Sequence, residues 1–160
     1  MSNFQIFVIK ILVGLGAILL NICFILPAYA VTQELQINGD RGYQVQTIFS
    51  YDEREHSKAL AKQERDVIEA IDNLRVSFYD PSGSMIASYD NIVDGVAQGS
   101  YFEFHYDPIK QKLWGEIDLG GETVGEMYLK GNVAEELALI KVEASGEEKI
   151  VDRLSASVNR

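Results

Sequence analysis

Residues 101–131 constrain the fold of this chain more than any other stretch, because apolar and polar side chains alternate along them. The positions on one predicted face are Phe102, Phe104, Tyr106, Leu113, Gly115, Ile117 and Leu119. Turn-forming residues interrupt the alternation at 107–112 and again at Gly120-Gly121. A period of two indicates a β-sheet with one apolar and one polar face. The stretch therefore predicts three antiparallel strands. The side chains we expect to be buried are Phe102, Phe104, Leu113, Ile117 and Leu129.

The same alternation recurs along most of the chain. The other predicted strands are residues 43–51, 74–79, 85–89, 137–144 and 149–154. Asp80-Pro81-Ser82-Gly83 has the composition of a β-turn, since Asp caps the backbone at the first position and Pro presets φ at the second. Connections this short force neighbouring strands to pair antiparallel. We expect an all-β fold, a single antiparallel barrel or sandwich of about eight strands that occupies residues 43–160.

Two segments do not follow the strand pattern. Residues 52–73 are rich in Lys, Glu, Arg and Ala and contain neither Gly nor Pro. Four apolar residues recur there at helical spacing: Leu60, Val67, Ile68 and Ile71. This spacing predicts one short helix after the first strand, with a charged loop as the alternative. Residues 31–42 are polar, and we expect them to form a flexible N-terminal segment.

The first thirty residues have the features of a secretory signal peptide. Lys10 precedes an apolar run, and the run ends in Pro27-Ala28-Tyr29-Ala30, which contains an A-x-A cleavage pattern. We expect cleavage near Ala30 and a secreted protein, located in a periplasm, a lumen or the extracellular space, without a stable membrane anchor. The alternative is that the segment is retained as an anchor, because the apolar run is long enough to span a bilayer.

The charge balance excludes several classes of partner. The formal net charge is −10, and Lys10 is the only charged residue among the first thirty, so cleavage leaves a mature charge of −11. A protein this acidic repels nucleic acid and anionic membrane surfaces. Cleavage also removes Cys23, the only cysteine, so we expect a mature chain without disulfides.

Several short blocks of sequence carry a resemblance to a group of proteins. The blocks read FSYDE, VSFYDPSG, SYFEFHYDP, LWGEIDLGG and YLKG, and they cover residues 49–53 and most of 74–131. In order and spacing they resemble the blocks of small secreted all-β proteins of unknown function from cyanobacteria. Many of those proteins end in a PEP-CTERM sorting tail, whereas this sequence ends LSASVNR without Pro-Glu-Pro. The resemblance implies secretion and an all-β fold, and it supplies no catalytic residue.

The register expected for residues 101–131 places polar side chains in rows across three strands. A turn centred between Ile109 and Lys110 pairs Tyr106 with Leu113. A three-residue loop at Gly120-Gly121-Glu122 fixes the next pairing. The two predicted rows are Glu103–Glu116–Glu126 and His105–Trp114–Tyr128. The candidate ligand-binding residues are therefore Tyr101, Glu103, His105, Trp114, Glu116, Glu126 and Tyr128.

Three interpretations of these rows stay open. The first is a solvated acidic face, on which screening makes the repulsion between carboxylates small. The second is a site for a divalent cation, since carboxylates are hard oxygen ligands. The third is a platform on which Trp114, Tyr128 and Tyr101 stack against a sugar while carboxylates bind its hydroxyls. We assign no metal ligand, no cofactor and no catalytic residue.

The sequence favours a secreted, non-catalytic binding or envelope-associated module of unknown ligand, with a glycan or a cell-envelope component as the candidate partner. The alternative is a carbohydrate-acting hydrolase that uses Glu103 and Glu116 on the acidic face. That chemistry needs two carboxyl groups about 5–9 Å apart across a cleft, and an open sheet face provides no cleft. No serine lies in a G-x-S-x-G motif either, so a non-enzymatic role is the preferred prediction.

Overall fold

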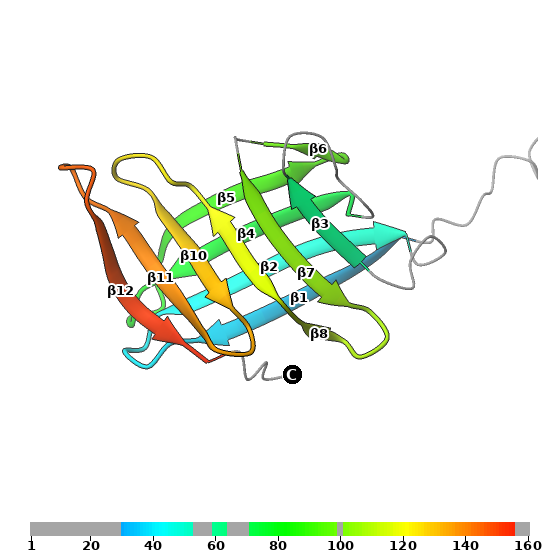
Figure 1. Ribbon diagram of the computed structural model, residues 1–160, viewed down its shortest axis with the longest axis horizontal. Coiled ribbons are helices and arrows are strands. Elements are labelled where there is room, and N and C mark those ends of the chain that lie inside the picture. Colours follow the sequence, from blue (N-terminus) through cyan, green and yellow to red (C-terminus); the bar gives the residue numbers. More distant parts are fainter. Residues whose placement is uncertain (1–29, 53–58, 64–70, 99–100, 156–160) are drawn as a thin grey trace, which may run out of the picture.

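The computed structural model describes residues 30–52, 59–63, 71–98 and 101–155, and these form strands and turns without a helix. The strands are β1 (Ala30–Asn38), β2 (Gln44–Asp52), β3 (Ala59–Gln63), β4 (Asn73–Tyr79), β5 (Met85–Val93), β6 (Val96–Ala97), β7 (Phe102–Asp107), β8 (Lys112–Leu113), β9 (Glu116–Gly120), β10 (Met127–Asn132), β11 (Glu136–Val142) and β12 (Glu148–Leu154). They make two antiparallel sheets, ordered β1-β2-β4-β5-β6 and β12-β11-β10-β9-β7-β3, with β8 paired to β7. Figure 1 shows the two sheets packed face to face, with the strands of one running across those of the other. The predicted all-β fold is confirmed.

The core lies between the two sheets and is supplied by the alternating side chains of their strands. On β2 the inward residues are Val45, Thr47, Phe49 and Tyr51. The five side chains predicted to be buried in residues 101–131 are buried: Phe102, Phe104, Leu113, Ile117 and Leu129. The ring of Phe49 meets the rings of Phe104 and Tyr106 edge to face, with centroids 5.0 and 4.8 Å apart. These aromatic contacts join the two sheets at the centre of the fold.

A buried carboxylate joins the sheets a second time, where β1 and β12 approach each other. Asp152 on β12 is 1% exposed, and its carboxylate accepts hydrogen bonds from the backbone N–H of Arg41 at 3.0 Å and of Tyr43 at 3.2 Å. Gly39 forms a backbone bridge to Leu154 beside it. A Cβ at Gly39 would overlap the carboxylate of Asp152, so any other residue there would displace this carboxylate. This junction closes one side of the sandwich.

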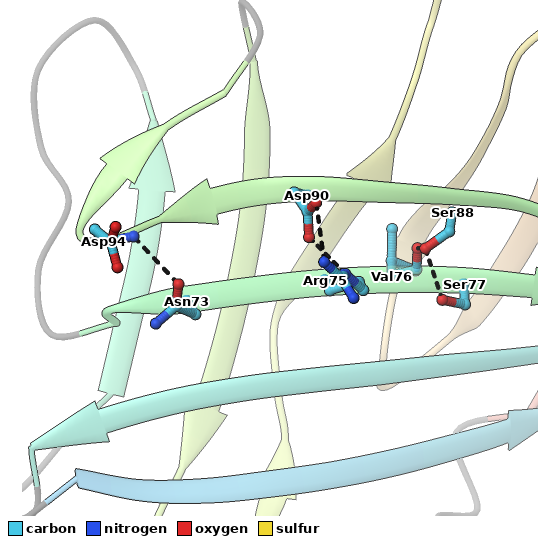
Figure 2. Close-up of polar contacts among 7 residues, drawn as sticks. All are labelled: Asn73, Arg75, Val76, Ser77, Ser88, Asp90 and Asp94. Atoms are coloured by element: carbon cyan, nitrogen blue, oxygen red, sulfur yellow. Dashed lines mark hydrogen bonds and ion pairs between the residues drawn. The ribbon is translucent and has the colours of Figure 1, made fainter.

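The outer face of the first sheet is covered by polar side chains that bind one another across the strands (Figure 2). Arg75 on β4 donates to both carboxylate oxygens of Asp90 on β5, at 2.6 and 3.2 Å. The hydroxyls of Ser77 and Ser88, on the same two strands, lie 2.9 Å apart. These pairs stabilise the sheet and neutralise the charge of Asp90.

The predicted helix after the first strand is wrong for residues 59–63. They form β3, which pairs antiparallel with β7 from Ala59 opposite Tyr106 to Gln63 opposite Phe102. The N–H and C=O groups along the edge of β7 offer a full set of hydrogen bonds, and such pairing overrides the weak helical preference of a short segment. The remaining residues of this prediction, 53–58 and 64–70, lie outside the described residues.

Residues 31–42 also differ from the expected flexible segment. Most of them belong to β1, which pairs with β2 along its whole length from Ala30 to Asn38. Leu35 and Ile37 of β1 are buried in the core, and this burial holds the strand in place. The sheets contain more than the predicted eight or so strands because β1, β3 and the two-residue strands β6 and β8 add to them.

The predicted signal peptide lies outside the described residues except for Ala30, which begins β1. Cys23 lies in the same undescribed part of the chain. In the part that the structure describes, no helix is long and apolar enough to cross a membrane.

Candidate functional site

Four of the seven candidate binding residues meet on the outer face of the second sheet. The Nε2 atom of His105 lies 2.7 Å from Oε1 of Glu103, and the hydroxyl of Tyr101 donates to Oε2 of Glu103 at 2.9 Å. The indole ring of Trp114 packs against the imidazole ring of His105, with centroids 4.6 Å apart and planes tilted by 47°. We call Tyr101, Glu103, His105 and Trp114 the aromatic–acid cluster.

The cluster combines nearly buried polar groups with an exposed aromatic surface. The side chains of Glu103 and His105 are each 12% exposed, whereas Tyr101 is 36% and Trp114 is 42% exposed. Because a carboxylate accepts only, Nε2 of His105 carries the proton that it shares with Glu103. The other ring nitrogen, Nδ1, is buried and has no hydrogen-bond partner among the described residues. The indole is thus held at the surface on a base of fixed polar groups.

The turn that brings Trp114 back toward β7 is closed by local hydrogen bonds. One oxygen of Asp107 accepts from the backbone N–H of Ile109 at 3.0 Å and of Lys110 at 2.8 Å. The backbone hydrogen bond from Lys110 is the largest cause that lowers the pKa of Asp107. The turn places Tyr106 opposite Leu113, which is the predicted pairing.

Gly115 bends the chain directly after Trp114. Its φ of +68° lies in the left-handed region, which glycine adopts without strain. The N–H of Trp114 still donates to the carbonyl of His105 at 3.2 Å, so the indole and the imidazole stay adjacent. The chain then leaves the hairpin register that it followed up to this point.

Both predicted rows are wrong beyond this bend. Glu103 lies opposite Asp118 and not opposite Glu116, because the bend adds residues to one strand only. The β9–β10 connection is also longer than the predicted three residues, and it places Lys130 opposite Asp118. The row across the three strands therefore reads Glu103, Asp118, Lys130, with a cation where a third carboxylate was expected.

Lys130 neutralises the carboxylate beside Glu103. Its Nζ lies 3.0 Å from Oδ2 of Asp118 and 4.0 Å from Oε1 of Glu122. Asp118 is 6% exposed, and this burial raises its pKa, against the hydrogen bond and charge of Lys130, which lower it. The hydrogen bond to Asp118 in turn raises the pKa of Lys130. An ion pair thus replaces part of the repulsion expected on this face.

Two other candidate residues lie apart from the cluster. Glu116 accepts a hydrogen bond of 2.7 Å from the side-chain amide of Asn132, its partner across the strands. Glu126 lies in the loop between β9 and β10, where its carboxylate accepts from the N–H of Thr123 at 2.8 Å. Glu116 is therefore engaged in the sheet, and Glu126 in the loop.

Tyr128, predicted to stack beside Trp114, is instead 1% exposed. It packs with Ile140 and Val142 in a small apolar cluster away from the main core. Its burial, followed by the neighbouring carboxylate of Glu148, raises the pKa of its phenol. Tyr128 supports the sheet and presents no ring to a ligand.

The sequence analysis did not include Asp118 or Lys130 among the candidate site residues or in the predicted rows. The signal was present, because Asp118 stands between the buried residues Ile117 and Leu119 and alternation directs it outward. The pairing partner was wrong, since the bend at Gly115 shifts the register.

The titratable groups of this face are paired with one another, and the exposed part of the cluster is aromatic. Within the described residues, no three His, Cys, Asp or Glu side chains are grouped so that they could hold a metal ion. Asp118, whose raised pKa would suit a proton donor, is covered and paired with Lys130. What the cluster offers to a ligand is the exposed ring of Trp114 above fixed polar side chains.

Comparison of the chain with protein-family models, with curated proteins and with solved structures finds no match. We therefore infer the function from the geometry of the site.

Proposed function

We propose that the protein is a secreted, non-catalytic binding module that holds a glycan against the exposed ring of Trp114. The observation that carries the proposal is this ring, 42% exposed and packed on His105, which Glu103 holds in turn. An aromatic ring offers a flat apolar surface to the C–H face of a sugar. Because its supports are already fixed, little conformational entropy is lost when a ligand binds.

The surroundings of Trp114 match a polyhydroxylated ligand. Tyr101 brings a second exposed aromatic ring to the same cluster, and its hydroxyl gives that ring a polar edge. The hydroxyl of Tyr101 donates to Glu103, and a phenol oxygen can also accept a hydrogen bond from a sugar hydroxyl. Sugars combine apolar faces with many hydroxyl donors, so a surface of rings and acceptors complements them.

Hydrolysis of the glycan is less well supported than binding. The two adjacent carboxylates of the face are Glu103 and Asp118. Glu103 is held by His105, and Asp118 is 6% exposed and paired with Lys130. A glycosidase needs one carboxyl group that reaches the leaving oxygen and a second that reaches the ring carbon or a water. Neither carboxyl group here projects into solvent.

Secretion is part of the proposal and follows from the apolar segment and the A-x-A pattern that ends at Ala30. The position of β1 supports it, since the first core residues of this strand are Leu35 and Ile37, after the cleavage site. Intact mass of protein exported by its native host tests this part. A chain that begins at Val31 is expected, and a chain that still begins at Met1 would contradict secretion by cleavage.

A glycan array probed with the mature protein tests the binding function. Wild-type protein should bind a defined subset of glycans, and Trp114→Ala should weaken that binding at least about tenfold, because stacking on the ring is lost. Ile109→Ala is the matched control, since Ile109 is an apolar side chain 78% exposed in the neighbouring turn.

Four outcomes are decisive for this proposal. Loss of binding in Trp114→Ala and its retention in Ile109→Ala supports it. Equal binding by wild type and Trp114→Ala places the ligand elsewhere, and absence of binding to every glycan removes the function. Release of reducing sugar from a bound glycan would show a hydrolase instead.

A further inference from the structure

A cleft of about 620 Å³ opens beside the aromatic–acid cluster, between β5 of one sheet and the β9–β10 loop of the other. Its volume lies within the range of small-molecule sites. Tyr101 lines the cleft and also belongs to the cluster, so the two surfaces are continuous. Gly121 forms part of the wall, where a Cβ would overlap both the carboxylate of Glu126 and the ring of Tyr89. Glycine keeps this space open.

One residue that lines the cleft has a buried side-chain oxygen without a partner among the described residues. Asn91 lines the cleft and is 2% exposed, and its Nδ2 donates to the carbonyl of Gly120 at 3.4 Å. Because a carbonyl only accepts, this contact fixes the amide so that Oδ1 faces away from Gly120. Oδ1 has no hydrogen-bond partner among the described residues. A buried acceptor left unpaired is unfavourable, so this position calls for a ligand group that donates.

The charged side chains that line the cleft indicate whether the donor group of the ligand is neutral or cationic. Its carboxylates are Asp90, Glu122 and Glu126, and none of the described residues that line it is Lys, Arg or His. Asp90 is neutralised by Arg75 (Figure 2), and Glu122 lies 4.0 Å from Lys130. Glu126 accepts one backbone hydrogen bond, from Thr123, and has no cationic partner in the described part of the chain. One negative charge without a cationic partner among the described residues thus lies in the cleft that Asn91 also lines.

We propose that this cleft recognises a protonated primary amine, and that the glycan bound at Trp114 therefore carries unacetylated amino sugars. The inference rests on the proposed glycan-binding function. An ammonium group has three donors and no acceptor, so it can satisfy Oδ1 of Asn91 and the carboxylate of Glu126 together. An acetylated amine is neutral and bulky, and it offers only one donor to the same two groups. The net charge of −10 favours a cationic ligand as well.

Two matched oligosaccharides separate this inference from the function on which it rests. The probes are a β-1,4-linked glucosamine tetrasaccharide and its fully N-acetylated counterpart, titrated calorimetrically into the mature protein at mildly acidic pH and low salt. The free amine should bind about tenfold more tightly, which is the size of one charge-assisted hydrogen bond. The preference should shrink as salt is added, because the site is open to solvent.

Variants locate the preference in the cleft. Glu126→Gln keeps an acceptor for Thr123 while it removes the charge, so it should abolish most of the preference for the amine. Glu147→Gln makes the same change of charge at an exposed turn outside the cleft and should leave the preference intact. Thermal melting of each variant verifies that the fold is retained, and the comparison of the two ligands on wild-type protein needs no variant.

The outcomes distinguish the two proposals. Equal affinity for both oligosaccharides, or a preference that Glu126→Gln leaves unchanged, overturns the amine site and leaves glycan binding in place. If neither oligosaccharide binds, but the array shows binding of other glycans that lack amines, the amine site is overturned and glycan binding stands. If no glycan binds at all, the proposed function falls with it.

Discussion

Replacing Asp152 with alanine should destabilise the fold by about 3 kcal/mol. Its carboxylate accepts hydrogen bonds from the backbone N–H of Arg41 and Tyr43, across the junction of the two sheets. Hydrogen bonds to a charged group contribute about 1.5–3 kcal/mol each, so two give about 3–6 kcal/mol. Removal of the carboxylate also removes the unfavourable burial of its charge, which brings the net loss to the lower end of that range.

The assay is urea unfolding at neutral pH of residues 31–160, with Glu147→Ala at an exposed turn as the control variant. A loss of about 3 kcal/mol corresponds to a drop in melting temperature of about 6–12 °C for a domain of this size. Hydrogen exchange adds a local readout, because the amides of Arg41 and Tyr43 should lose protection first. A loss below about 1 kcal/mol, or equal to that of the control, would refute the role of Asp152 as the closing contact.

A double-mutant cycle with Gly39 tests the same geometry independently. Gly39→Ala alone should destabilise the protein, because the new methyl group overlaps the carboxylate of Asp152. In the background of Asp152→Ala the overlap is gone, so the combined loss should be smaller than the sum of the two single losses. Strict additivity would mean that the two residues do not touch.

Three further predictions concern the second sheet. Phe104→Ala should lower the free energy of unfolding, measured by chemical denaturation, by about 3–5 kcal/mol because the ring is fully buried. A loss below about 1 kcal/mol would contradict the place of Phe104 in the core. Glu116→Gln should change stability by less than about 0.5 kcal/mol, since an amide oxygen can still accept from Asn132; a clear gain in stability would restore the predicted row of carboxylates. Burial and the neighbouring Glu148 raise the pKa of Tyr128, so its phenol ionises at lower pH in the unfolded chain than in the folded protein. The free energy of unfolding should therefore fall as pH rises above about 10. Tyr128→Phe should flatten this part of the profile of stability against pH, and an unchanged profile would contradict the prediction.

Local alternation predicted the strands well, because each strand buries one face and the sequence records which side chains belong there. Phe102, Phe104 and Leu113 were placed correctly by period alone. The pairing of Tyr106 with Leu113 was also predictable, since Asp107 closes the intervening turn with hydrogen bonds to its own neighbours. Features that depend on a few adjacent residues can be derived from the sequence.

Features that depend on distant contacts could not be derived. The register beyond Gly115 follows from a positive φ at that glycine, and alternation alone does not reveal a bend. Residues 59–63 form a strand because the edge of β7 is available beside them, whereas their own sequence is compatible with a helix. Arg41, whose backbone N–H binds Asp152, lies more than a hundred residues before it in the sequence, so no local pattern predicts this contact.

The candidate site divides in the same way. Tyr101, Glu103 and His105 alternate along one segment, and Trp114 follows the next turn, so the sequence could bring all four together. The cleft is lined by Asn91 of β5 and by Glu126 of the β9–β10 loop, and only the packing of the two sheets brings these segments to one cleft. Alternation therefore predicted that these four side chains share one face, whereas no local pattern predicted the cleft between β5 and the β9–β10 loop.

The central claim is that a glycan binds on the ring of Trp114, and intrinsic fluorescence tests it most directly because Trp114 is the only tryptophan in the chain. A glycan that binds in the array is titrated into wild-type protein while tryptophan emission is recorded. The account predicts a saturable shift of the emission to shorter wavelength, with the dissociation constant found by calorimetry, as the sugar displaces water from the indole. Calorimetric binding of the same glycan with unchanged tryptophan emission would contradict it.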